Sequence, residues 1–476
     1  MPNLTINGIS IEVEAGATVL DAAAALGVGI PTLCHLKGRE PETSCMLCVV
    51  RNTATGQLVP SCSAKAVEGM EVETEREEVQ AARRDILNLL LSEHVGDCEA
   101  PCVRICPAGL DVPLMLREIE RGDLESAAWI AKRDLAIPAT LGHICPAPCE
   151  KGCRRGQLDE ALKIREAHKQ VSLDFQNHSH PFPNAGGKVA VIGSGAAGLS
   201  CAWTLRSLGY GCVIFDEADK AGGALRSDER LPAAVLNDEI ESLWRAGIEF
   251  KLGAPISLHE IAEGYDGVVF AAVEHIDTRF ADAVYAEEHK LAVKAVANGK
   301  AAAVAIDRFL KGEAPEFKKS FDSKIGKPRE SEIRELLKNC SEPDSVDDLA
   351  VEAARCLRCD CRKPTSCKLR LYSERYGADQ REFPADERGH IQLIGHDESV
   401  VFEPGKCVKC GLCVKITKEA GERLGLAFVG RGFNTRVAVP FGNSLKDGLR
   451  DAAAECVAAC PTGALAFTSA EERRPD

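Results

Sequence analysis

The sequence lacks long hydrophobic runs, because none of its apolar stretches approaches the ~20 residues that a membrane-spanning helix requires. Aromatic residues make up only 5% of the chain, although 45% of its residues are hydrophobic, a balance typical of a globular protein. The start, MPNLTINGISIEVEAG, lacks the basic segment and apolar stretch of a signal peptide. We therefore expect a cytoplasmic protein without membrane insertion.

Net positive charge is also lacking. The formal net charge is −14. An acidic surface cannot neutralise phosphates, so this balance disfavours nucleic acid and anionic membrane surfaces as partners.

Cysteine, in contrast, is abundant, with 22 residues. A chain in a reducing compartment keeps its thiols free unless metal holds them. Such a large number of cysteines therefore points to metal binding. Most of them fall into tight groups along the sequence. Four stand apart, and we expect these to be small buried side chains: Cys201, Cys212, Cys340 and Cys456.

The hydrophobic periodicity divides the chain into regions of different class. Near the N-terminus, alternating residues predict short strands around a small helix at 19–25, followed by a helix within 76–94. Further along, KVAVI and CVIFD read as buried parallel strands around a helix that starts near Ala197. The chain is therefore expected to hold both α+β and α/β parts.

The first metal motif is Cys34-x10-Cys45-x2-Cys48-x13-Cys62, which provides four thiolates for a [2Fe–2S] cluster, with zinc as the alternative. The surrounding GATVLDAAAALGVGIPTLCH, SCMLCVV and VPSCSAKAVEGMEVETE resemble the start of the large iron–sulfur subunit of respiratory complex I and its relatives among hydrogenases and formate dehydrogenases. Ser44 departs from the glycine usual there. In that family His94 and Cys98 would begin a cubane with one histidine ligand.

The next stretch diverges from that family. Its segments CVRICPAGLDVP and HICPAPCEKGC resemble the helical two-cluster domain of the glutamate synthase small subunit and of dihydropyrimidine dehydrogenase. The resemblance implies two cross-ligated [4Fe–4S] clusters. One would be held by His94, Cys98, Cys102 and Cys153, and the other by Cys106, Cys145 and Cys149 with His168 as fourth ligand. For His168 the alternative is an ordinary hydrogen-bonded side chain.

Two further cysteine groups lie near the C-terminus. Cys407-x2-Cys410-x2-Cys413 with a distant Cys460-Pro is the ferredoxin pattern and predicts one [4Fe–4S] cluster. The other group consists of Cys356, Cys359, Cys361 and Cys367. Its spacing is less specific and is compatible with a fourth cubane, with zinc or with free thiols.

A glycine-rich turn between a strand and a helix, GSGAAG, predicts dinucleotide binding. Gly193 permits the tight turn, Gly195 the approach of a pyrophosphate and Gly198 close helix packing, while Asp216 stands where ribose hydroxyls would bind.

The neighbouring sequence resembles the flavin domain of the glutamate synthase small subunit, including Gly222 and Gly223, and implies FAD. Two departures count against FAD. Val273 and Glu274 replace the Thr-Gly of those enzymes, and Glu287 and Glu288 fall where they carry Gly-Asp. The alternative is a Rossmann domain kept for packing. No second fingerprint for NAD(P)H follows.

Together the motifs predict five parts. They are a β-grasp-like [2Fe–2S] ferredoxin domain at 1–78, a helical domain with two [4Fe–4S] sites at 79–183, a Rossmann-like FAD-type domain at 184–315, a linker with the four-cysteine site at 316–395 and a ferredoxin-like domain at 396–476.

No catalytic acid, base or nucleophile stands out in the sequence. We therefore expect an electron-transfer subunit of a multisubunit oxidoreductase with one [2Fe–2S] cluster, three to four [4Fe–4S] clusters and FAD. Its partners would be other redox subunits that carry the substrate or NAD(P) site, with ferredoxin as a further candidate. The rival hypotheses are a stand-alone or bifurcating flavoprotein reductase and a scaffold that metal only stabilises.

Overall fold

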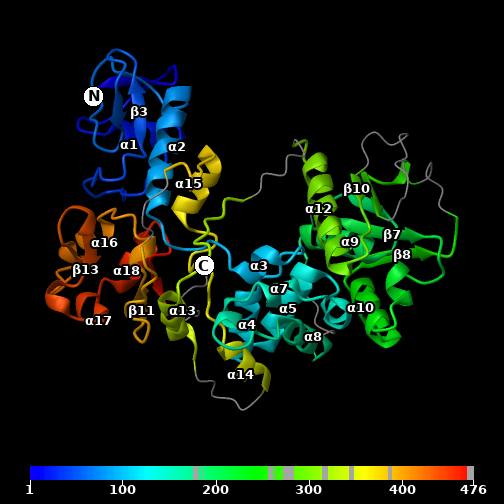
Figure 1. The fold of residues 1–476 in the computed structure, drawn as a ribbon. Helices are drawn as coiled ribbons and strands as arrows, with labels where there is room; N and C mark the ends of the chain where they lie inside the picture. The colour runs from blue at the N-terminus through cyan, green and yellow to red at the C-terminus, as the bar shows by residue number, and fades with distance from the viewer. Residues whose placement is uncertain are drawn as a thin grey trace. The chain divides into compact units, whose positions relative to one another are not determined.

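The computed structural model divides into two compact units that interleave along the sequence (Figure 1). Unit 1 comprises Met1–Glu99, Ser320–Asn339 and Asp360–Asp476, and unit 2 comprises Ala100–Lys319 and Cys340–Cys359. The structure describes residues 1–174, 182–184, 186–255, 261, 263–271, 284–313, 320–341, 348–383 and 389–468. The predicted five-part division stays a prediction.

Unit 1 begins with a five-stranded sheet in the order β2-β1-β5-β3-β4. Its strands are β1 (Asn3–Ile6), β2 (Ile9–Glu12), β3 (Val49–Asn52), β4 (Leu58–Pro60) and β5 (Glu71–Glu73). The pair β1 and β5 is parallel and the other pairs are antiparallel. Alternate residues of β1, Leu4 and Ile6, are buried, as the alternating sequence predicts.

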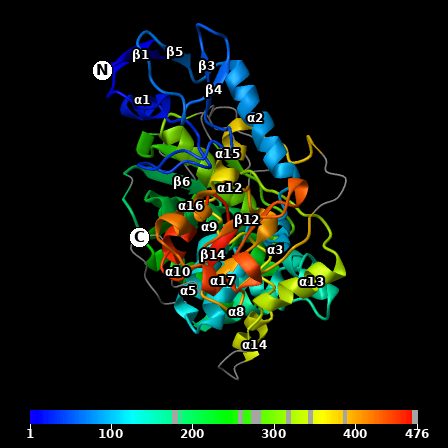
Figure 2. The same cartoon turned by 90° about the vertical axis from the view of Figure 1, so that its left-hand side faces the viewer.

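The predicted small helix is present as α1 (Val19–Ala25), beside this sheet in Figure 2. A capping box starts it, because the Thr18 hydroxyl accepts from the Asp21 N–H while the Asp21 carboxylate accepts from the Thr18 N–H. The second predicted helix is α2 (Glu77–Ser92). Its buried Arg83 donates to the Tyr376 hydroxyl at 3.1 Å and to the Val49 carbonyl at 2.9 Å, which ties α2 to the sheet and to α15 (Lys368–Tyr376).

The C-terminal part of unit 1 is built on two short antiparallel pairs. They are β11 (Val400–Phe402) with β14 (Leu465–Phe467), and β12 (Ala427–Val429) with β13 (Arg436–Ala438). The helices of this part are α16 (Leu412–Glu419), α17 (Leu445–Gly448) and α18 (Ala453–Ala459), and α13 (Glu330–Leu336) comes from the segment 320–339. One buried apolar cluster, including Ile416 and Cys456, packs α16 and α18 together.

Unit 2 contains a group of short helices. They are α3 (Pro101–Ile105), α4 (Val112–Glu120), α5 (Leu124–Leu135), α6 (Pro138–Ile144), α7 (Pro148–Lys151), α8 (Ile164–Asp174) and α14 (Asp348–Ala354). Proline stands in the first turn of α3, α4, α6 and α7, where its missing N–H costs nothing. Asp111 and Asp123 cap α4 and α5 by accepting backbone N–H groups.

The rest of unit 2 is a parallel sheet in the order β10-β9-β6-β7-β8. Its strands are β6 (Lys188–Ile192), β7 (Gly211–Asp216), β8 (Ile248–Leu252), β9 (Gly267–Ala271) and β10 (Val284–Ala286). The helices α9 (Ala196–Leu208), α10 (Ala233–Arg245) and α12 (Ala292–Leu310) accompany it in Figure 1. Helices α9 and α12 cross closely, since a Cβ on Gly299 would lie 2.1 Å from the Ala197 carbonyl oxygen.

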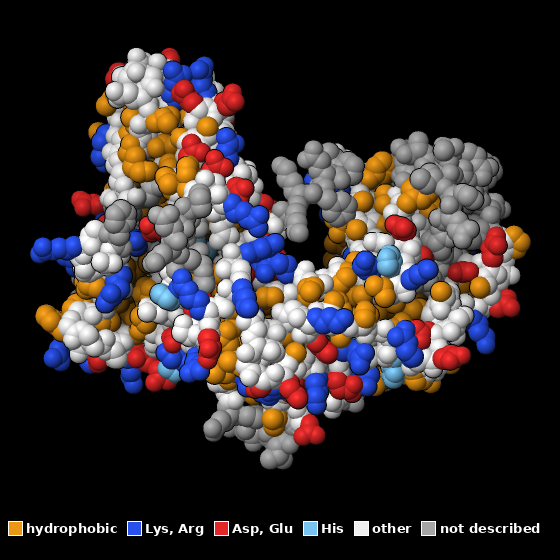
Figure 3. Space-filling model, in the orientation of Figure 1, with side chains coloured by type: hydrophobic (Ala, Val, Ile, Leu, Met, Phe, Trp, Pro, Cys, Tyr) orange, Lys and Arg blue, Asp and Glu red, His pale blue; other side chains and the backbone are white. Residues whose placement is uncertain are grey.

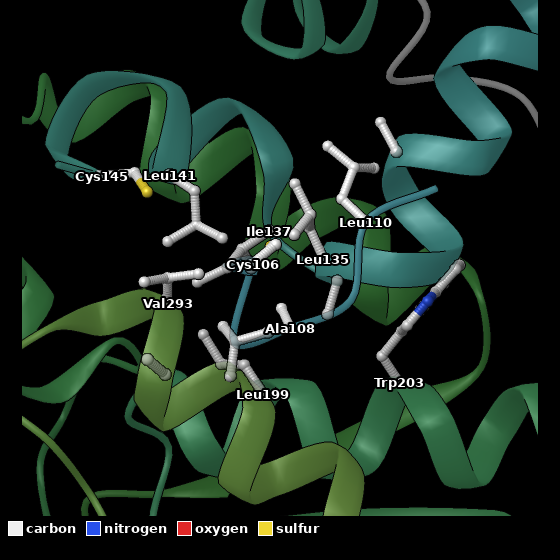
Figure 4. Close-up of a cluster of buried hydrophobic side chains, with 14 of the residues drawn as sticks. Cys106, Ala108, Leu110, Leu135, Ile137, Leu141, Cys145, Leu199, Trp203 and Val293 are labelled. Atoms are coloured by element: carbon white, nitrogen blue, oxygen red, sulfur yellow. The ribbon is translucent and has the colours of Figure 1, made fainter. Parts of the chain in front are cut away.

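The two parts of unit 2 share one apolar core. Figure 4 shows Leu110, Leu135 and Ile137 of the helical part together with Leu199 and Trp203 of α9. The mixed α/β class predicted from the sequence is therefore confirmed, and both parts are held in one body.

On the face drawn in Figure 3, Lys and Arg side chains are interspersed with Asp and Glu side chains. None of the helices in the described ranges combines the length and the hydrophobicity needed to cross a bilayer.

Candidate metal centres

The structure brings together the four cysteines of the first motif. Cys34, Cys45, Cys48 and Cys62 are all buried, and the Sγ atoms of Cys34 and Cys45 lie 3.3 Å apart. The Cys45 thiol lowers the pKa of Cys34, and the Cys48 thiol lowers that of Cys62. The same contacts raise the pKa of Cys45 and of Cys48, so one thiol of each pair ionises more readily than its partner. Thiolates are the ligands of iron.

The loop that carries these thiols is held in an unusual conformation. Thr43 and Met46 have φ angles of 50° and 56°, which non-glycine residues rarely adopt. The Thr43 hydroxyl lies 3.8 Å from Cys62 Sγ. The backbone therefore turns so that this loop faces the fourth cysteine, which follows β4.

The ferredoxin pattern also converges in space. Cys407 and Cys410 precede α16, Cys413 lies in its first turn, and Cys460 ends α18. Burial raises the pKa of Cys407 to about 11 and that of Cys410 to about 12, with the neighbouring thiols adding to the increase. Four buried or half-buried thiols that interact electrostatically with one another fit the ligand set of an iron–sulfur cluster.

The loops of these two sites touch within unit 1. The Ser44 hydroxyl donates to the Cys410 carbonyl at 3.0 Å, and Lys415 Nζ donates to the Glu40 carbonyl at 2.6 Å. Cys34 and Cys410 belong to the same buried apolar cluster. The sequence shows Ser44 only as a departure from the usual glycine. Its hydrogen bond to the distant Cys410 carbonyl could not be predicted from the neighbouring residues.

His94 and Cys98 follow α2. The His94 side chain is half-buried, but its Nδ1 is shielded from solvent and has no hydrogen-bond partner. Burial, assisted by the Lys406 ammonium, lowers the pKa of His94 to about 4, so the ring is neutral at pH 7. A neutral imidazole with an unused buried nitrogen fits a metal ligand.

The neighbours of Cys98 come from the second half of the sequence. Its Sγ lies 3.4 Å from the Ser323 hydroxyl, and its carbonyl accepts from the Cys361 N–H at 3.3 Å. The thiols of Cys361 and Cys367 are hydrogen-bonded to each other. Burial raises the pKa of Cys98 and the Cys361 thiol adds to the increase, while the Cys98 thiol in turn contributes to the raised pKa of Cys367. Unit 1 thus gathers Cys98, Cys361 and Cys367.

In unit 2, Cys102 and Cys153 lie beside the other half of the same cysteine-rich segment. A small cavity is lined by Cys102, Cys153, Cys356 and Cys359 together with Pro101, Val112 and Ile164. Burial raises the pKa of Cys102 well above its ordinary value, and Cys356, Cys359 and Cys153 raise it further. The pairing with Cys356 and Cys359 was not foreseen from spacing.

Cys106, Cys145 and Cys149 form a further group in unit 2. Cys106 and Cys145 end α3 and α6, as Figure 4 shows, and Cys149 lies in α7. Burial raises the pKa of Cys145 and of Cys149, and the Cys106 thiol adds to both. Lys300 Nζ, whose pKa the Cys106 thiol influences, donates to the Ala108 carbonyl at 2.6 Å.

His168 is buried on α8, and its Nδ1 lies 3.0 Å from the Pro138 carbonyl oxygen. Burial lowers the pKa of His168 to about 4. Its role as a ligand stays a prediction.

Within the described ranges, no three His, Cys, Asp or Glu side chains stand at the spacing of a single bound metal ion. Of the remaining cysteines, Cys201, Cys212 and Cys456 are buried, as expected, while Cys340 is half-buried and accepts a hydrogen bond from Arg155.

The glycine-rich turn has the predicted backbone. Gly193 has a φ of 106°, and a Cβ on Gly198 would lie 1.9 Å from the Gly193 carbonyl oxygen. Asp216 ends β7 and accepts from the Ser194 N–H at 2.7 Å. Gly222, with a φ of 119°, donates to the Ser194 carbonyl, and a Cβ on Gly223 would lie 3.1 Å from the Gly195 Cα.

A carboxylate stands where a pyrophosphate would bind. Glu288 Oε1 accepts from the Ala197 N–H at 2.9 Å, and a Cβ on Gly195 would lie 2.2 Å from the same oxygen. The N-terminus of α9 thus holds an anion of the chain itself, and two anions cannot share it. In this conformation the residues do not fit a dinucleotide. Val273 and Glu274 lie outside the described residues.

Three segments match family models. Residues 2–77 match the 2Fe-2S iron-sulfur cluster binding domain, residues 72–180 match dihydropyrimidine dehydrogenase domain II, 4Fe-4S cluster, and residues 191–260 match the NAD(P)-binding Rossmann-like domain.

Curated relatives match part of the chain. The chain is 33% identical over 213 residues to the NADP(+)-dependent formate dehydrogenase subunit beta of Moorella thermoacetica. It is 30% identical over 190 residues to the NADPH-Fe(3+) oxidoreductase subunit beta of Geobacter sulfurreducens. It is 31% identical over 185 residues to the NAD-dependent dihydropyrimidine dehydrogenase subunit PreT of Salmonella typhimurium.

These alignments cover 38%, 37% and 36% of this chain and 30%, 28% and 45% of the three relatives, so the chain spans less than half of the length of each. The expected resemblances are confirmed for the matched segments. The chain combines a 2Fe–2S domain, a 4Fe–4S domain of the dihydropyrimidine dehydrogenase type and a Rossmann-like domain, and it is similar to the beta subunits of a formate dehydrogenase and of an NADPH-Fe(3+) oxidoreductase.

Proposed function

We propose that this chain is an electron-transfer subunit of a multisubunit oxidoreductase of the formate dehydrogenase, hydrogenase or NAD-linked type. The observation that carries the proposal is the contact between two buried thiol sites in unit 1, where the Ser44 hydroxyl binds the Cys410 carbonyl at 3.0 Å. Iron–sulfur clusters held at such sites accept and release single electrons. Adjacent sites within one compact unit are what a relay requires.

The chain's own residues would hold the clusters. Cys34, Cys45, Cys48 and Cys62 would bind a [2Fe–2S] cluster, and Cys407, Cys410, Cys413 and Cys460 a [4Fe–4S] cluster. Cys106, Cys145 and Cys149 would bind a second [4Fe–4S] cluster, with His168 as the proposed fourth ligand. All of these thiols are buried or half-buried, which limits the access of water to a bound cluster.

The partners would be the subunits that carry the substrate or NAD(P) site, with ferredoxin as a further partner, in the cytoplasm. Two of the similar proteins are beta subunits by name, one of a formate dehydrogenase and one of an NADPH-Fe(3+) oxidoreductase. These names support the proposal that this chain is a subunit that transfers electrons for another chain.

FAD was the expected companion of these clusters, and the Rossmann-like segment favours a nucleotide. The Glu288 carboxylate at the N-terminus of α9 opposes it. We therefore derive no electron transfer through a flavin.

The same Rossmann-like segment favours the rival function of a flavoprotein reductase that works alone or bifurcates electrons. This rival requires flavin in the purified chain and reduction of that flavin by NAD(P)H. A scaffold would instead hold metal that is never reduced.

The test is anaerobic purification followed by EPR and NADPH oxidation. We expect [2Fe–2S] and [4Fe–4S] signals after reduction with dithionite, and no NADPH-dependent reduction of an artificial acceptor by the chain alone. Turnover of NADPH at enzymic rates by the isolated chain would contradict the proposal. Clusters that resist reduction down to about −700 mV would show a scaffold.

A further inference from the structure

The cysteine-rich segment 356–367 crosses from one compact unit to the other in the middle of its motif. Residues 340–359 belong to unit 2, and the segment from Asp360 onward belongs to unit 1. Cys356 and Cys359 therefore lie in a different body from Cys361 and Cys367. The two halves of the motif thus pack among different residues, Cys356 and Cys359 among those of unit 2 and Cys361 and Cys367 among those of unit 1.

Arginines on the two sides of the crossover fix this division. Arg358 Nη2 pairs with Glu120 Oε2 of α4 at 2.5 Å, and Arg358 has a φ of 47°. Arg362 pairs with Glu403 Oε1 at 3.1 Å and donates to Asn339 Oδ1 at 2.6 Å. The chain is thus anchored to unit 2 just before Cys359 and to unit 1 just after Cys361.

In unit 2 the first half of the segment completes a set of four thiols. Cys356 and Cys359 line one small cavity together with Cys102 and Cys153. Both also influence the ionisation of Cys102. The lining of this cavity includes four thiols. Cysteines that are buried only as small apolar side chains are not expected to converge on one cavity, whereas metal ligands are.

In unit 1 the second half of the segment meets Cys98. The Cys361 N–H donates to the Cys98 carbonyl at 3.3 Å, and the thiols of Cys361 and Cys367 are in contact. A Cβ on Gly463 would lie 2.5 Å from Cys361 Sγ, so only glycine leaves this thiol its place. His94 of the same unit has a shielded Nδ1 without a hydrogen-bond partner, and both His94 and Cys361 interact electrostatically with Lys406.

We propose that the segment is shared between two [4Fe–4S] sites, an inference that rests on the proposed electron-transfer function. Cys102, Cys153, Cys356 and Cys359 form one ligand set, and His94, Cys98, Cys361 and Cys367 form the other. This replaces the ligand set of His94, Cys98, Cys102 and Cys153 expected from resemblance, and also the single site at 356–367. Only Asp360 then separates ligands of the two clusters along the chain.

The test compares the EPR signals and the iron content of single Cys→Ser variants of the full chain, purified anaerobically. Cys356→Ser and Cys102→Ser should lose or alter the same [4Fe–4S] signal, with a loss of about four iron atoms where the cluster is absent. Cys361→Ser and Cys98→Ser should both affect a second signal and leave the first unchanged.

Cys340→Ser is the matched control, because Cys340 is half-buried beside the segment but belongs to neither ligand set. It should retain every signal. Should a serine variant fail to fold, His94→Cys preserves four ligands and should keep the iron content while changing the g-values of only the signal that Cys361→Ser affects.

The outcomes separate this inference from the proposed function. Wild-type protein without reducible clusters would defeat the function itself. Reducible clusters in which Cys356→Ser and Cys361→Ser affect one and the same signal would overturn the shared segment and leave the function standing.

Discussion

Lys406 is a buried cation beside the proposed histidine-ligated site. Its ammonium pairs with Glu403 Oε2 at 2.7 Å, and a Cβ on Gly96 would lie 2.8 Å from its Cε. Burial alone would lower the pKa of Lys406, but the Glu403 carboxylate and the Cys361 thiolate raise it above its ordinary value. The side chain is therefore charged at neutral pH, and a cation near thiolates stabilises an added electron.

Lys406→Met should accordingly lower the midpoint potential of the cluster that Cys361 binds. We expect a decrease on the order of 50 mV, since about 60 mV corresponds to ~1.4 kcal/mol for one electron. Arg362 still pairs with Glu403 in the variant, so this carboxylate is not left alone. The potential is measured by EPR-monitored redox titration.

The control for this variant is Lys409→Met. Lys409 is more exposed and pairs with Glu93 at 3.2 Å, so water screens its charge. Equal shifts in the two variants, or a higher potential in Lys406→Met, would disprove the assigned role of Lys406.

Glu288 decides whether the Rossmann-like part of unit 2 can bind a dinucleotide. Its carboxylate accepts from the Ala197 N–H at the position that a pyrophosphate needs. Glu288→Ala should free this position and increase the affinity for FAD at least tenfold over wild type. Fluorescence quenching of added FAD measures the affinity, and acid-released flavin measures what is bound on purification.

Glu287→Ala is the matched control, since Glu287 is exposed and adjacent in sequence. It should leave the affinity for FAD unchanged. Stoichiometric FAD in wild-type protein would show that Glu288 moves aside and would restore the expectation from resemblance.

At the scale of elements, α6 depends on a carboxylate from α10. Glu239 is buried and accepts from the Ala139 and Thr140 N–H groups at 2.9 and 2.7 Å, which satisfies the first turn of α6. Helix α6 ends at Cys145, a proposed ligand. The Rossmann-like part of unit 2 thus positions a ligand of the helical part.

The cation that faces Glu239 is Lys132 of α5, whose Nζ also donates to the Ser242 hydroxyl at 2.8 Å and lies 5.2 Å from the centre of the Trp203 ring. Burial lowers the pKa of Lys132 from 10.5 to about 8, although Glu239 opposes this decrease. Between about pH 8 and pH 10.5, Lys132 is protonated more fully in the unfolded chain than in the folded chain. The free energy of unfolding therefore rises with pH in this range.

Lys132→Met should remove this rise. Anaerobic calorimetry at several pH values from about 7.5 to above about 10 measures the unfolding temperature of wild type and variant. As the pH increases, the unfolding temperature of wild type should rise relative to that of the variant. A difference that does not change with pH would contradict the lowered pKa of Lys132.

The sequence predicts elements better than it predicts which of them meet. Helix 19–25, the strand KVAVI and the turn at Gly193 follow from local patterns and are present. The grouping of Cys98 with Cys361 has no local signal, because 262 intervening residues lie between them, most of them in another unit. Spacing identifies cysteines that bind metal, but packing decides which distant ones share a cluster.

At the scale of the whole molecule, unit 1 is a discontinuous body. The chain leaves it after Glu99, returns for Ser320–Asn339, leaves again and returns at Asp360. The N-terminal sheet and α2 belong to the same unit as β11, β14 and α16, although these elements lie at opposite ends of the sequence.

This shared body leads to a prediction about magnetic coupling. Cys34 and Cys410 lie in one buried cluster of side chains, and Ser44 binds the Cys410 carbonyl. A reduced [4Fe–4S] cluster at Cys410 should therefore accelerate the spin relaxation of a reduced [2Fe–2S] cluster at Cys34. In fully reduced wild type, the [2Fe–2S] signal should require higher microwave power for saturation than in Cys410→Ser, which loses that cubane.

Cys106→Ser is the control, because it removes a cubane proposed for unit 2 and leaves the loops around Ser44 and Cys410 intact. Its [2Fe–2S] signal should saturate as in wild type, whereas that of Cys410→Ser should saturate at lower power. Identical saturation in wild type and Cys410→Ser, with both clusters reduced in wild type, would mean that these neighbouring sites do not act as consecutive stations for an electron.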